Sequence, residues 1–318
     1  MVKDYEVLMA TYNGSRYILD QLNSIAFQTH PPSRIVISDD CSSDNTLSLI
    51  KSWQALHDID VSILPQLGYS LGVCKNFERL LENSTFDYVM LSDQDDIWEP
   101  DKAEQMLSVL IETELSYLPS IPLLVYSDLR IINSTGLYIY PSFFAYQKIN
   151  PVINNWLSLG LQNVVTGCAC VVNRKCVTQS LPFSTETLLH DWWLAMVASY
   201  HGQIIYLPQP LVRYRQHTNN VVGASGFQSL VFSRILSLFK RKSPDYFIGN
   251  SLRQLKSFSN RYVSFDTNSS LLIRNLFSIS RFRRIASALK LGLRKHGFIR
   301  TLSFYILLFF WNPISINR

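Results

Sequence analysis

The sequence predicts an α/β protein whose sheet is flanked by helices, with a basic helical extension at its C-terminal end. Strand and helix patterns alternate over the first hundred residues. Acidic clusters directly follow two of the apolar strands. The charge also changes sign along the chain. Residues 1–228 hold 13 Lys and Arg against 22 Asp and Glu, and residues 229–318 hold 16 against 2, so the net charge of +5 combines −9 with +14.

Four short apolar strands are expected near the N-terminus, at residues 5–9, 34–38, 61–64 and 88–91. Helices with one apolar face connect them, an alternation typical of a sheet with parallel neighbouring strands. In the next helix, Asp101 and Glu104 have the spacing of a capping box. Later strands are expected at residues 123–126, 170–172 and 204–207, with a helix at about 192–200.

The boundary between the two regions is predicted near residue 225, which gives an α/β domain at residues 1–225 and a basic, amphipathic helical region at residues 226–318. Charged residues make up 17% of the chain, below the roughly 25% of an average soluble protein, which predicts an apolar surface that a membrane or a partner covers. The longest apolar run near the end is residues 302–311. It is shorter than the about 20 residues of a helix that spans a bilayer, so it is expected to lie in the membrane–water interface.

The five cysteines form no C-x-x-C pair and have no histidines nearby at the spacing of zinc ligands. Such a pattern indicates reduced, buried thiols in a cytoplasmic protein. The N-terminal residues run directly into a strand pattern without the apolar segment of a signal peptide, so no secretion is predicted.

Carboxylates fall at the carboxyl ends of two predicted strands: Asp39, Asp40, Asp93, Asp95 and Asp96. In an open α/β sheet the ligand crevice lies at this edge, so the two groups are expected to meet there. Clustered ionised carboxylates repel one another unless a cation offsets them. Turn preference alone explains a single Asp-x-Asp, but two such strand ends favour a site for Mg²⁺ or Mn²⁺, which prefer oxygen ligands.

Three motifs in order then resemble glycosyltransferase family 2, which has the GT-A nucleotide-sugar fold, a Rossmann-like mixed sheet flanked by helices. They lie at residues 7–14 (VLMATYNG), 37–46 (ISDDCSSDNT) and 91–98 (LSDQDDIW). The resemblance continues through residues 190–193 (HDWW) and 214–223 (YRQHTNNVVG), and it covers roughly residues 3–225. It implies that residues 1–225 are a glycosyltransferase catalytic domain.

The resemblance implies a binding site for a nucleotide sugar at the end of the first two strands. Thr11, Tyr12 and Asn13 would line it, with the Tyr12 ring stacking on or bordering the base. Asp40 would accept a hydrogen bond from the base N–H. Cys41 stands where the family often has Gly, in the turn before Ser42.

The resemblance also implies a metal site and a general base. Asp95 would ligate a metal ion that bridges the two phosphates, and Asp93 would approach the ribose or the metal. His217 would complete the metal shell or contact the diphosphate, and Arg215 would offset phosphate charge. Asp191 matches the general base that deprotonates the acceptor hydroxyl in an inverting displacement, although without the resemblance it is as readily a helix cap.

The sequences of the motifs at residues 92–98, 190–193 and 214–217 resemble those of the bacterial rhamnosyltransferase-like branch of this family. Members of that branch build O-antigen, capsule or rhamnan chains, which implies a dTDP-rhamnose donor and a polysaccharide or lipid-linked saccharide acceptor. Two alternatives stay open at this point. A nucleotidyltransferase also uses strand-end carboxylates and a metal, and a non-catalytic scaffold with the same fold can bind partners through the basic tail.

The C-terminal region carries clusters of basic residues between apolar helical residues, at 240–242, 281–284 and 294–295. This composition is typical of peripheral docking on an anionic inner membrane, close to a polyprenyl-diphosphate-linked acceptor. A solvated helical extension or an oligomerisation surface is the alternative. Nucleic-acid binding is not expected, because no aromatic and basic readout module is recognisable.

Overall fold

The computed structural model describes residues 3–117, 121–152, 155–217 and 248–313. The predicted boundary near residue 225, the motif residues 218–223 and the basic cluster at residues 240–242 lie outside the described residues. The chain divides into two compact units. The first comprises Met1–Gln147, Val165–Phe183 and Leu189–Ala224, and the second comprises Lys148–Val164, Ser184–Leu188 and Ser225–Arg318.

The first unit is built on a mixed sheet with the strand order β3-β2-β1-β4-β8-β6-β9-β5, and β7 pairs with β6 outside this order. Its strands are β1 (Glu6–Thr11), β2 (Arg34–Asp39), β3 (Asp60–Ile63), β4 (Tyr88–Ser92), β5 (Ile97–Trp98), β6 (Leu123–Asn133), β7 (Tyr138–Tyr140), β8 (Cys170–Asn173) and β9 (Gln203–Gln216). The four strands from β3 to β4 run parallel, which confirms the predicted parallel arrangement. Beyond β4 the antiparallel β8 makes the sheet mixed.

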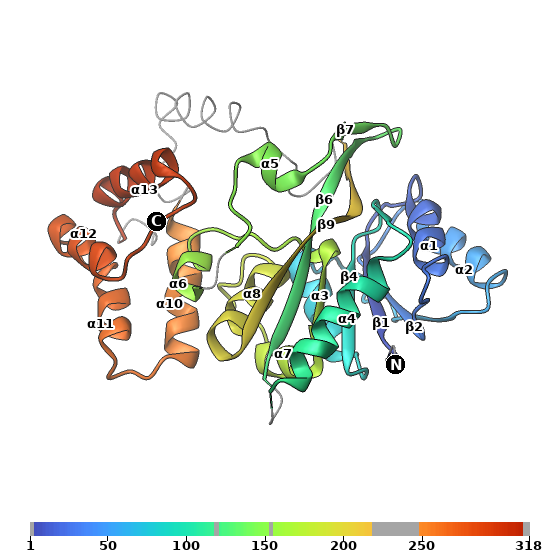
Figure 1. Ribbon diagram of the computed structural model, residues 1–318, viewed down its shortest axis with the longest axis horizontal. Helices are drawn as coiled ribbons and strands as arrows, with labels where there is room; N and C mark the ends of the chain where they lie inside the picture. Colours follow the sequence, from blue (N-terminus) through green and yellow to red (C-terminus); the bar gives the residue numbers. More distant parts are fainter. Residues whose placement is uncertain (1–2, 118–120, 153–154, 218–247, 314–318) are drawn as a thin grey trace. The chain divides into compact units, whose positions relative to one another are not determined.

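Helices cover both faces of this sheet (Figure 1). They are α1 (Ile18–Ala26), α2 (Thr46–Gln54), α3 (Val73–Glu82), α4 (Lys102–Leu115), α5 (Phe143–Gln147), α7 (Arg174–Ser180) and α8 (His190–His201), and a 3₁₀ turn lies at Gly167–Ala169. Side chains alternate across a strand, so Val7 and Met9 of β1 share one core cluster with apolar residues of α1, α2 and α4. The helices α3 and α8 pack against each other and against sheet strands. The result is a three-layer α/β/α unit.

The structure also corrects the sequence predictions in detail. Strands β6 and β9 extend well beyond the predicted residues 123–126 and 204–207, while β5, β7, α5 and α7 were not predicted. The predicted capping box is wrong, because neither side chain caps α4. Instead Asp101 accepts a hydrogen bond from Gln105 at 2.6 Å, and Glu104 accepts one from Thr29 at 2.8 Å.

The second unit is helical and includes two short segments from the middle of the sequence. Its helices are α6 (Trp156–Leu159), α10 (Asn250–Tyr262), α11 (Asn268–Asn275), α12 (Arg281–Lys290) and α13 (Phe298–Phe310). The ring of Trp156 stacks on Phe258 at 5.5 Å. Arg284, which is buried, donates to the carbonyls of Leu308 and Trp311 and so ties α12 to the end of α13. None of the helices in the described residues is both long and apolar enough to span a bilayer.

Candidate active site at the carboxyl ends of β1, β2 and β4

The carboxylate at the end of β2 organises the first loop of the site. Asp39 accepts hydrogen bonds from the hydroxyl of Thr11 at 2.8 Å, from the hydroxyl and N–H of Ser42 at 2.6 and 2.9 Å, and from Gln66 at 2.8 Å. Both of its oxygens are therefore occupied, and Asp39 is only 3% exposed. Since Thr11 also points into this network, its side chain shapes the loop from within.

The turn after β1 is fixed to the turn after β2 by side chains at both ends. Asn13 has φ +48° and its side-chain oxygen accepts from the N–H of Ser43 at 2.8 Å. The N–H of Asn13 donates to Ser42 and that of Gly14 donates to Thr46, both at 2.8 Å. Cys41 has φ +66°, so it adopts the left-handed turn that Gly enters without strain. Cys41 thus adopts a left-handed conformation at the position where the family often has Gly.

Asp40 reaches across to the loop that precedes α3. Its carboxylate accepts from the hydroxyl of Ser70 at 2.6 Å and from the backbone N–H groups of Leu71 at 2.6 Å and Gly72 at 2.9 Å. The ring of Tyr12, by contrast, is 55% exposed. The loop end thus combines a carboxylate that is already hydrogen-bonded with an aromatic face open to a ligand.

Gln94 joins the β4 end to the β1 end. Its side-chain amide accepts from the N–H of Tyr12 and donates to the carbonyl of Tyr12, both at 2.8 Å. An added Cβ at Gly14 would lie 2.1 Å from the Gln94 side-chain oxygen, so this close approach needs glycine or a shift of the amide. Gln94, which lies between Asp93 and Asp95, therefore positions the backbone of Tyr12. The sequence did not predict this role.

The carboxylates after β4 are crowded. Burial and the charges of Asp96, Asp95 and Asp191 raise the pKa of Asp93 well above its usual value. Burial and the neighbouring Asp95 raise the pKa of Asp96 to about 7. Such shifts mean that the ionised forms repel one another and that a cation would be favourable here.

Ligand atoms of Asp93, Asp96 and Cys168 lie within 4.8 Å of one another, so these three residues form a group that can hold a metal ion. Burial raises the pKa of the Cys168 thiol well above its usual value, so the thiol is protonated in the metal-free protein. The carboxylate oxygens are the donors that Mg²⁺ and Mn²⁺ prefer, so the donor set fits a hard divalent cation. Asp96 was expected among the clustered carboxylates, whereas the metal ligands implied by the resemblance were Asp95, Asp93 and His217.

A buried lysine lies beneath these carboxylates. Lys102 is fully buried, donates to the carbonyl of Cys168 at 2.6 Å and lies 3.3 Å from the ring centroid of Trp98. Burial lowers the pKa of its ammonium to about 7, although the charges of Asp96 and Asp93 act in the opposite direction. The sequence offered one indication of this lysine, because Lys102 follows closely after the acidic residues 93–96 and begins α4.

Asp95 and His217 meet, as the predicted metal site requires. The imidazole Nε2 of His217 lies 2.7 Å from Asp95 Oδ2, and its ring stacks on Tyr17 at 5.2 Å. The strand β9 brings His217 to this point, because its last residues run beside the loop that follows β4.

Arg215 lies beneath Asp95 rather than in an open position. Its Nε donates to the backbone carbonyl of Asp95 at 2.7 Å, and its other nitrogens lie 3.2 Å from the carboxylate of Asp20 and 3.4 Å from the carbonyl of Ser134. The guanidinium also lies over the ring of Tyr17 at 4.5 Å. With a side chain only 3% exposed, Arg215 holds the acidic loop in place.

Asp191 lies in the first turn of α8 and is buried. Its carboxylate accepts from the N–H of Gly167 at 2.9 Å and from the N–H of Trp192 at 2.6 Å. The helix begins at His190 with Leu189 at the N-cap, so Asp191 is not the cap that the alternative reading assumed. Because the charge of Asp191 contributes to the raised pKa of Asp93, the two carboxylates belong to one electrostatic cluster.

His190 packs against this turn. Its ring stacks on Phe77 at 3.7 Å, and an added Cβ at Gly167 would lie 2.5 Å from its Nε2. Burial lowers the pKa of the imidazole to about 3, so it is neutral at physiological pH. The close packing against His190 thus requires glycine at position 167, whose backbone N–H also donates to Asp191.

The parallel half-sheet with clustered acidic groups at its carboxyl edge is the arrangement of an α/β enzyme whose ligand binds at that edge. The sequence profile described as glycosyl transferase family 2 matches residues 6–170, about half of the chain. The chain belongs to glycosyl transferase family 2 and is a glycosyltransferase, which sets aside the nucleotidyltransferase and scaffold alternatives.

Curated relatives and solved structures agree with this assignment. The dTDP-rhamnosyl transferase RfbG of Shigella flexneri is 31% identical over 228 residues, which cover 68% of this chain and 74% of that protein. The glucosyltransferase WfgD of Escherichia coli, described as acting on α-D-GlcNAc-diphosphoundecaprenol, is 25% identical over 191 residues, or 58% of this chain and 67% of that protein. The structure of Staphylococcus aureus TarS with UDP-GlcNAc superimposes with a TM-score of 0.55 at 14% identity, over 92% of this chain and 93% of that one, and shows the GT-A fold.

Proposed function

We propose that this chain is an inverting glycosyltransferase that moves a sugar from a nucleoside diphosphate to a saccharide acceptor in cell-surface polysaccharide synthesis. The observation that supports this most directly is the position of Asp191. Its carboxylate is buried, is held by two backbone N–H groups, and belongs to the same cluster as the acidic residues after β4. A general base needs this combination of fixed orientation and closeness to the donor site.

In this proposal the donor is dTDP-rhamnose and its nucleotide lies at the β1 and β2 ends. The exposed ring of Tyr12 would stack on or border the base, and Thr11 and Asn13 would shape that pocket. Asp40 would accept the base N–H in addition to its bonds from residues 70–72, because each carboxylate oxygen has two lone pairs. The likeness to RfbG supports the choice of sugar.

Asp95, Asp93 and His217 would hold Mn²⁺ or Mg²⁺, with Asp96 as a further oxygen ligand. When bound, the ion would supply Lewis-acid stabilisation of the charge that develops on the departing diphosphate. Arg215 and Gln94 would act on this site indirectly, since one fixes the backbone of Asp95 and the other fixes that of Tyr12.

The transfer itself is a single displacement. Asp191 takes the proton from the acceptor hydroxyl while that oxygen forms a bond to the anomeric carbon. The bond between the anomeric carbon and the diphosphate oxygen breaks, and the diphosphate leaves with the electron pair. Because attack comes from the face opposite the leaving group, the anomeric configuration inverts.

The helical unit offers a surface for an anionic membrane, where a polyprenyl-diphosphate-linked acceptor would lie. Along α13 the exposed apolar residues Phe298, Leu302, Ile306 and Phe310 recur every four positions on one stripe. On α12, the exposed Phe282 lies between the exposed Arg281 and Arg283. Apolar groups flanked by cations are the composition of helices that lie in the headgroup region, so we place the protein on the inner face of the cell membrane.

Replacement of Asp191 by Asn tests the central assignment. The two backbone N–H groups donate to different oxygens of Asp191, so we expect Asp191→Asn to keep one of these hydrogen bonds and lose the other. It should retain donor binding in a thermal-shift titration with Mn²⁺ and lose transfer by about 10³-fold. Asp58→Asn, which changes a carboxylate outside the acidic cluster, is the matched control and should leave transfer unchanged. Transfer by Asp191→Asn at the wild-type rate would rule out Asp191 as the base.

A further inference from the structure

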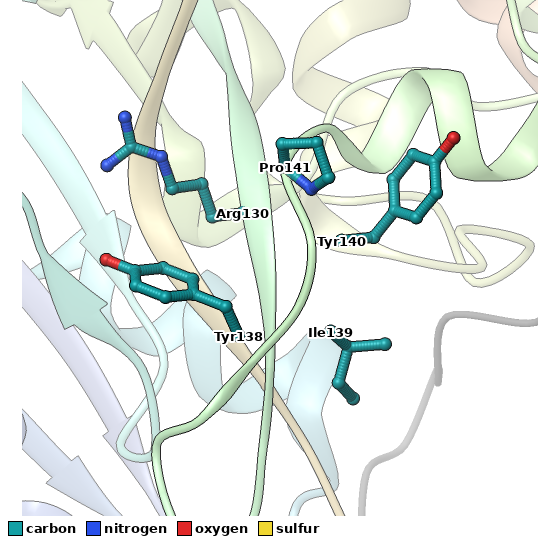
Figure 2. A pocket seen from close by; sticks show the side chains of 5 residues that line it. All are labelled: Arg130, Tyr138, Ile139, Tyr140 and Pro141. Atoms are coloured by element: carbon teal, nitrogen blue, oxygen red, sulfur yellow. The ribbon is translucent and has the colours of Figure 1, made fainter.

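We infer that a groove on the β6–β7 hairpin binds the saccharide of the acceptor, an inference that rests on the proposed glycosyl transfer. The groove has a volume of about 350 Å³ and is lined by Arg130, Tyr138, Ile139, Tyr140 and Pro141. Figure 2 shows these side chains around strand β7, with Arg130 and Tyr138 on one side of the strand and Ile139 and Tyr140 on the other. It is separate from the loops that surround Asp40 and Asp95.

The groove is unusual in how much apolar surface it leaves open. All three residues of β7 are exposed, with Tyr138 at 60% and Tyr140 at 39%, and Leu137 before them is 67% exposed. Exposed apolar clusters of this kind mark binding sites more often than inert surface. Tyrosine rings combine a broad apolar face with a hydroxyl, which suits the C–H face and the hydroxyls of a sugar ring.

Polar groups are held beside the ring of Tyr138. Glu99 accepts hydrogen bonds from Arg130 at 2.6 Å and from Arg213 at 3.0 and 3.1 Å. The guanidinium of Arg213 lies 5.9 Å from the ring centroid of Tyr138. Fixed N–H donors beside aromatic faces are the second requirement for binding a saccharide, because its hydroxyls need partners once water is displaced.

The groove lies within reach of the reacting groups. Arg213 and Arg215 are two residues apart on β9, so their side chains project from the same face and their Cα atoms are about 7 Å apart. Arg215 bonds both to the carbonyl of Asp95 and to the carbonyl of Ser134 in the hairpin turn. The side chain of Asn133 braces this turn through the N–H groups of Thr135 and Leu137, at 3.0 and 2.9 Å.

Charge favours a saccharide over a lipid surface as the occupant. Both arginines near the groove are paired with Glu99, whereas a surface that docks on anionic lipid uses cations free to meet headgroups. Within this chain such basic residues are concentrated in the helical region, not on this hairpin.

The test uses the full-length chain and, as acceptor, the diphosphate-linked oligosaccharides extracted from cells that lack this protein. We expect Tyr138→Ala and Tyr140→Ala each to raise the acceptor KM about tenfold, to leave the donor KM unchanged and to keep the wild-type Tm. Tyr138→Phe retains the ring and should stay close to wild type. Leu115→Ala removes an even more exposed apolar side chain, at the end of α4, and is the control.

Each other outcome counts against the inference. An unchanged acceptor KM in both alanine variants overturns it, even though the proposed transfer reaction then stands. Loss of co-sedimentation with phosphatidylglycerol vesicles, at unchanged acceptor KM in detergent, would assign the hairpin to lipid and overturn it as well. If the wild-type protein transfers no sugar from any nucleotide donor to this extract, the proposed function itself fails, and the inference fails with it.

Discussion

The ends of β2 and β4 carry the same chemical group in two opposite states. At the β2 end, Asp39 and Asp40 receive hydroxyl and N–H donors on both oxygens and anchor two loops. At the β4 end, Asp93 and Asp96 are crowded by other carboxylates, which together with burial raise their pKa values. Two neighbouring acidic clusters thus differ in whether the protein itself supplies enough hydrogen-bond donors to stabilise the ionised carboxylates.

The difference separates carboxylates that stabilise the fold from carboxylates that bind a ligand. Carboxylates that accept several hydrogen bonds stabilise the folded state and need nothing further. Carboxylates held together without enough donors cost stability, and a protein retains them where a ligand supplies the missing charge. On this basis we propose that the β2 end shapes the nucleotide pocket and that the β4 end holds the cation.

The largest expected effect comes from removing a carboxylate at the β4 end. Asp95→Ala should lower transfer by about 10³-fold, because it removes a proposed metal ligand and the carboxylate that lies 2.7 Å from His217 Nε2. The free energy of unfolding, measured by urea denaturation without divalent cations, should change little. Steady-state assays across a Mn²⁺ titration check the first expectation, and wild-type turnover would remove Asp95 from the metal site.

At the β2 end the same kind of substitution should act on stability. Asp39→Ala leaves donors from Thr11, Ser42 and Gln66 without their acceptor, so we expect the free energy of unfolding to fall by about 3 kcal/mol. Asp39→Asn keeps one acceptor oxygen and should lose less. Equal urea midpoints for wild type and Asp39→Ala would erase the contrast between the two strand ends.

Much of the sheet and of its acidic edge could be predicted from the sequence, because these features depend on local patterns. Apolar strands followed by acidic residues predicted the carboxyl edge, and the resemblance placed Asp95 with His217, which the structure brings to 2.7 Å. The resemblance drew attention to Cys41, which stands where the family often has Gly, but the left-handed backbone there was not predicted.

The remainder depended on contacts between residues far apart in sequence. Nothing in the local pattern shows that Gln94 pairs with the backbone of Tyr12, or that Lys102 points inward beneath the acidic loop. Arg215 was expected to face phosphate, yet the structure uses it to hold Asp95 and the hairpin turn. Side-chain direction is decided by tertiary packing, and a motif does not encode it.

Gln94 connects the two strand ends, so its removal should sharpen the comparison. Gln94→Ala breaks both bonds to the backbone of Tyr12, and we expect the donor KM to rise about tenfold, equal to the loss of one or two hydrogen bonds. Because the carboxylates themselves remain, the Mn²⁺ concentration for half-maximal activity should stay near its wild-type value. A changed Mn²⁺ dependence at constant donor KM would place Gln94 in the metal site instead.

The smallest effect has the opposite sign, since a neutral group at the β4 end should stabilise the metal-free protein. The folded-state pKa of Asp93 is raised, so the ionised carboxyl is less favourable in the folded protein than in the unfolded chain. Asp93→Asn removes that penalty and should raise the free energy of unfolding by about 1 kcal/mol at neutral pH. The penalty exists only above the unfolded-state pKa, so the gain should shrink as pH falls toward about 4.

Divalent cations should reverse this ranking. Saturating Mn²⁺ stabilises whichever protein binds it by mass action, so wild type should gain Tm and Asp93→Asn should gain little. Thermal melts at pH 4 to 7.5, with and without Mn²⁺, measure both differences on the same pair of proteins. If Asp93→Asn is less stable than wild type without metal, then the protein itself stabilises the ionised carboxylate of Asp93, as it does those at the β2 end. Asp93 would then be a carboxylate that stabilises the fold, contrary to the contrast drawn between the two strand ends.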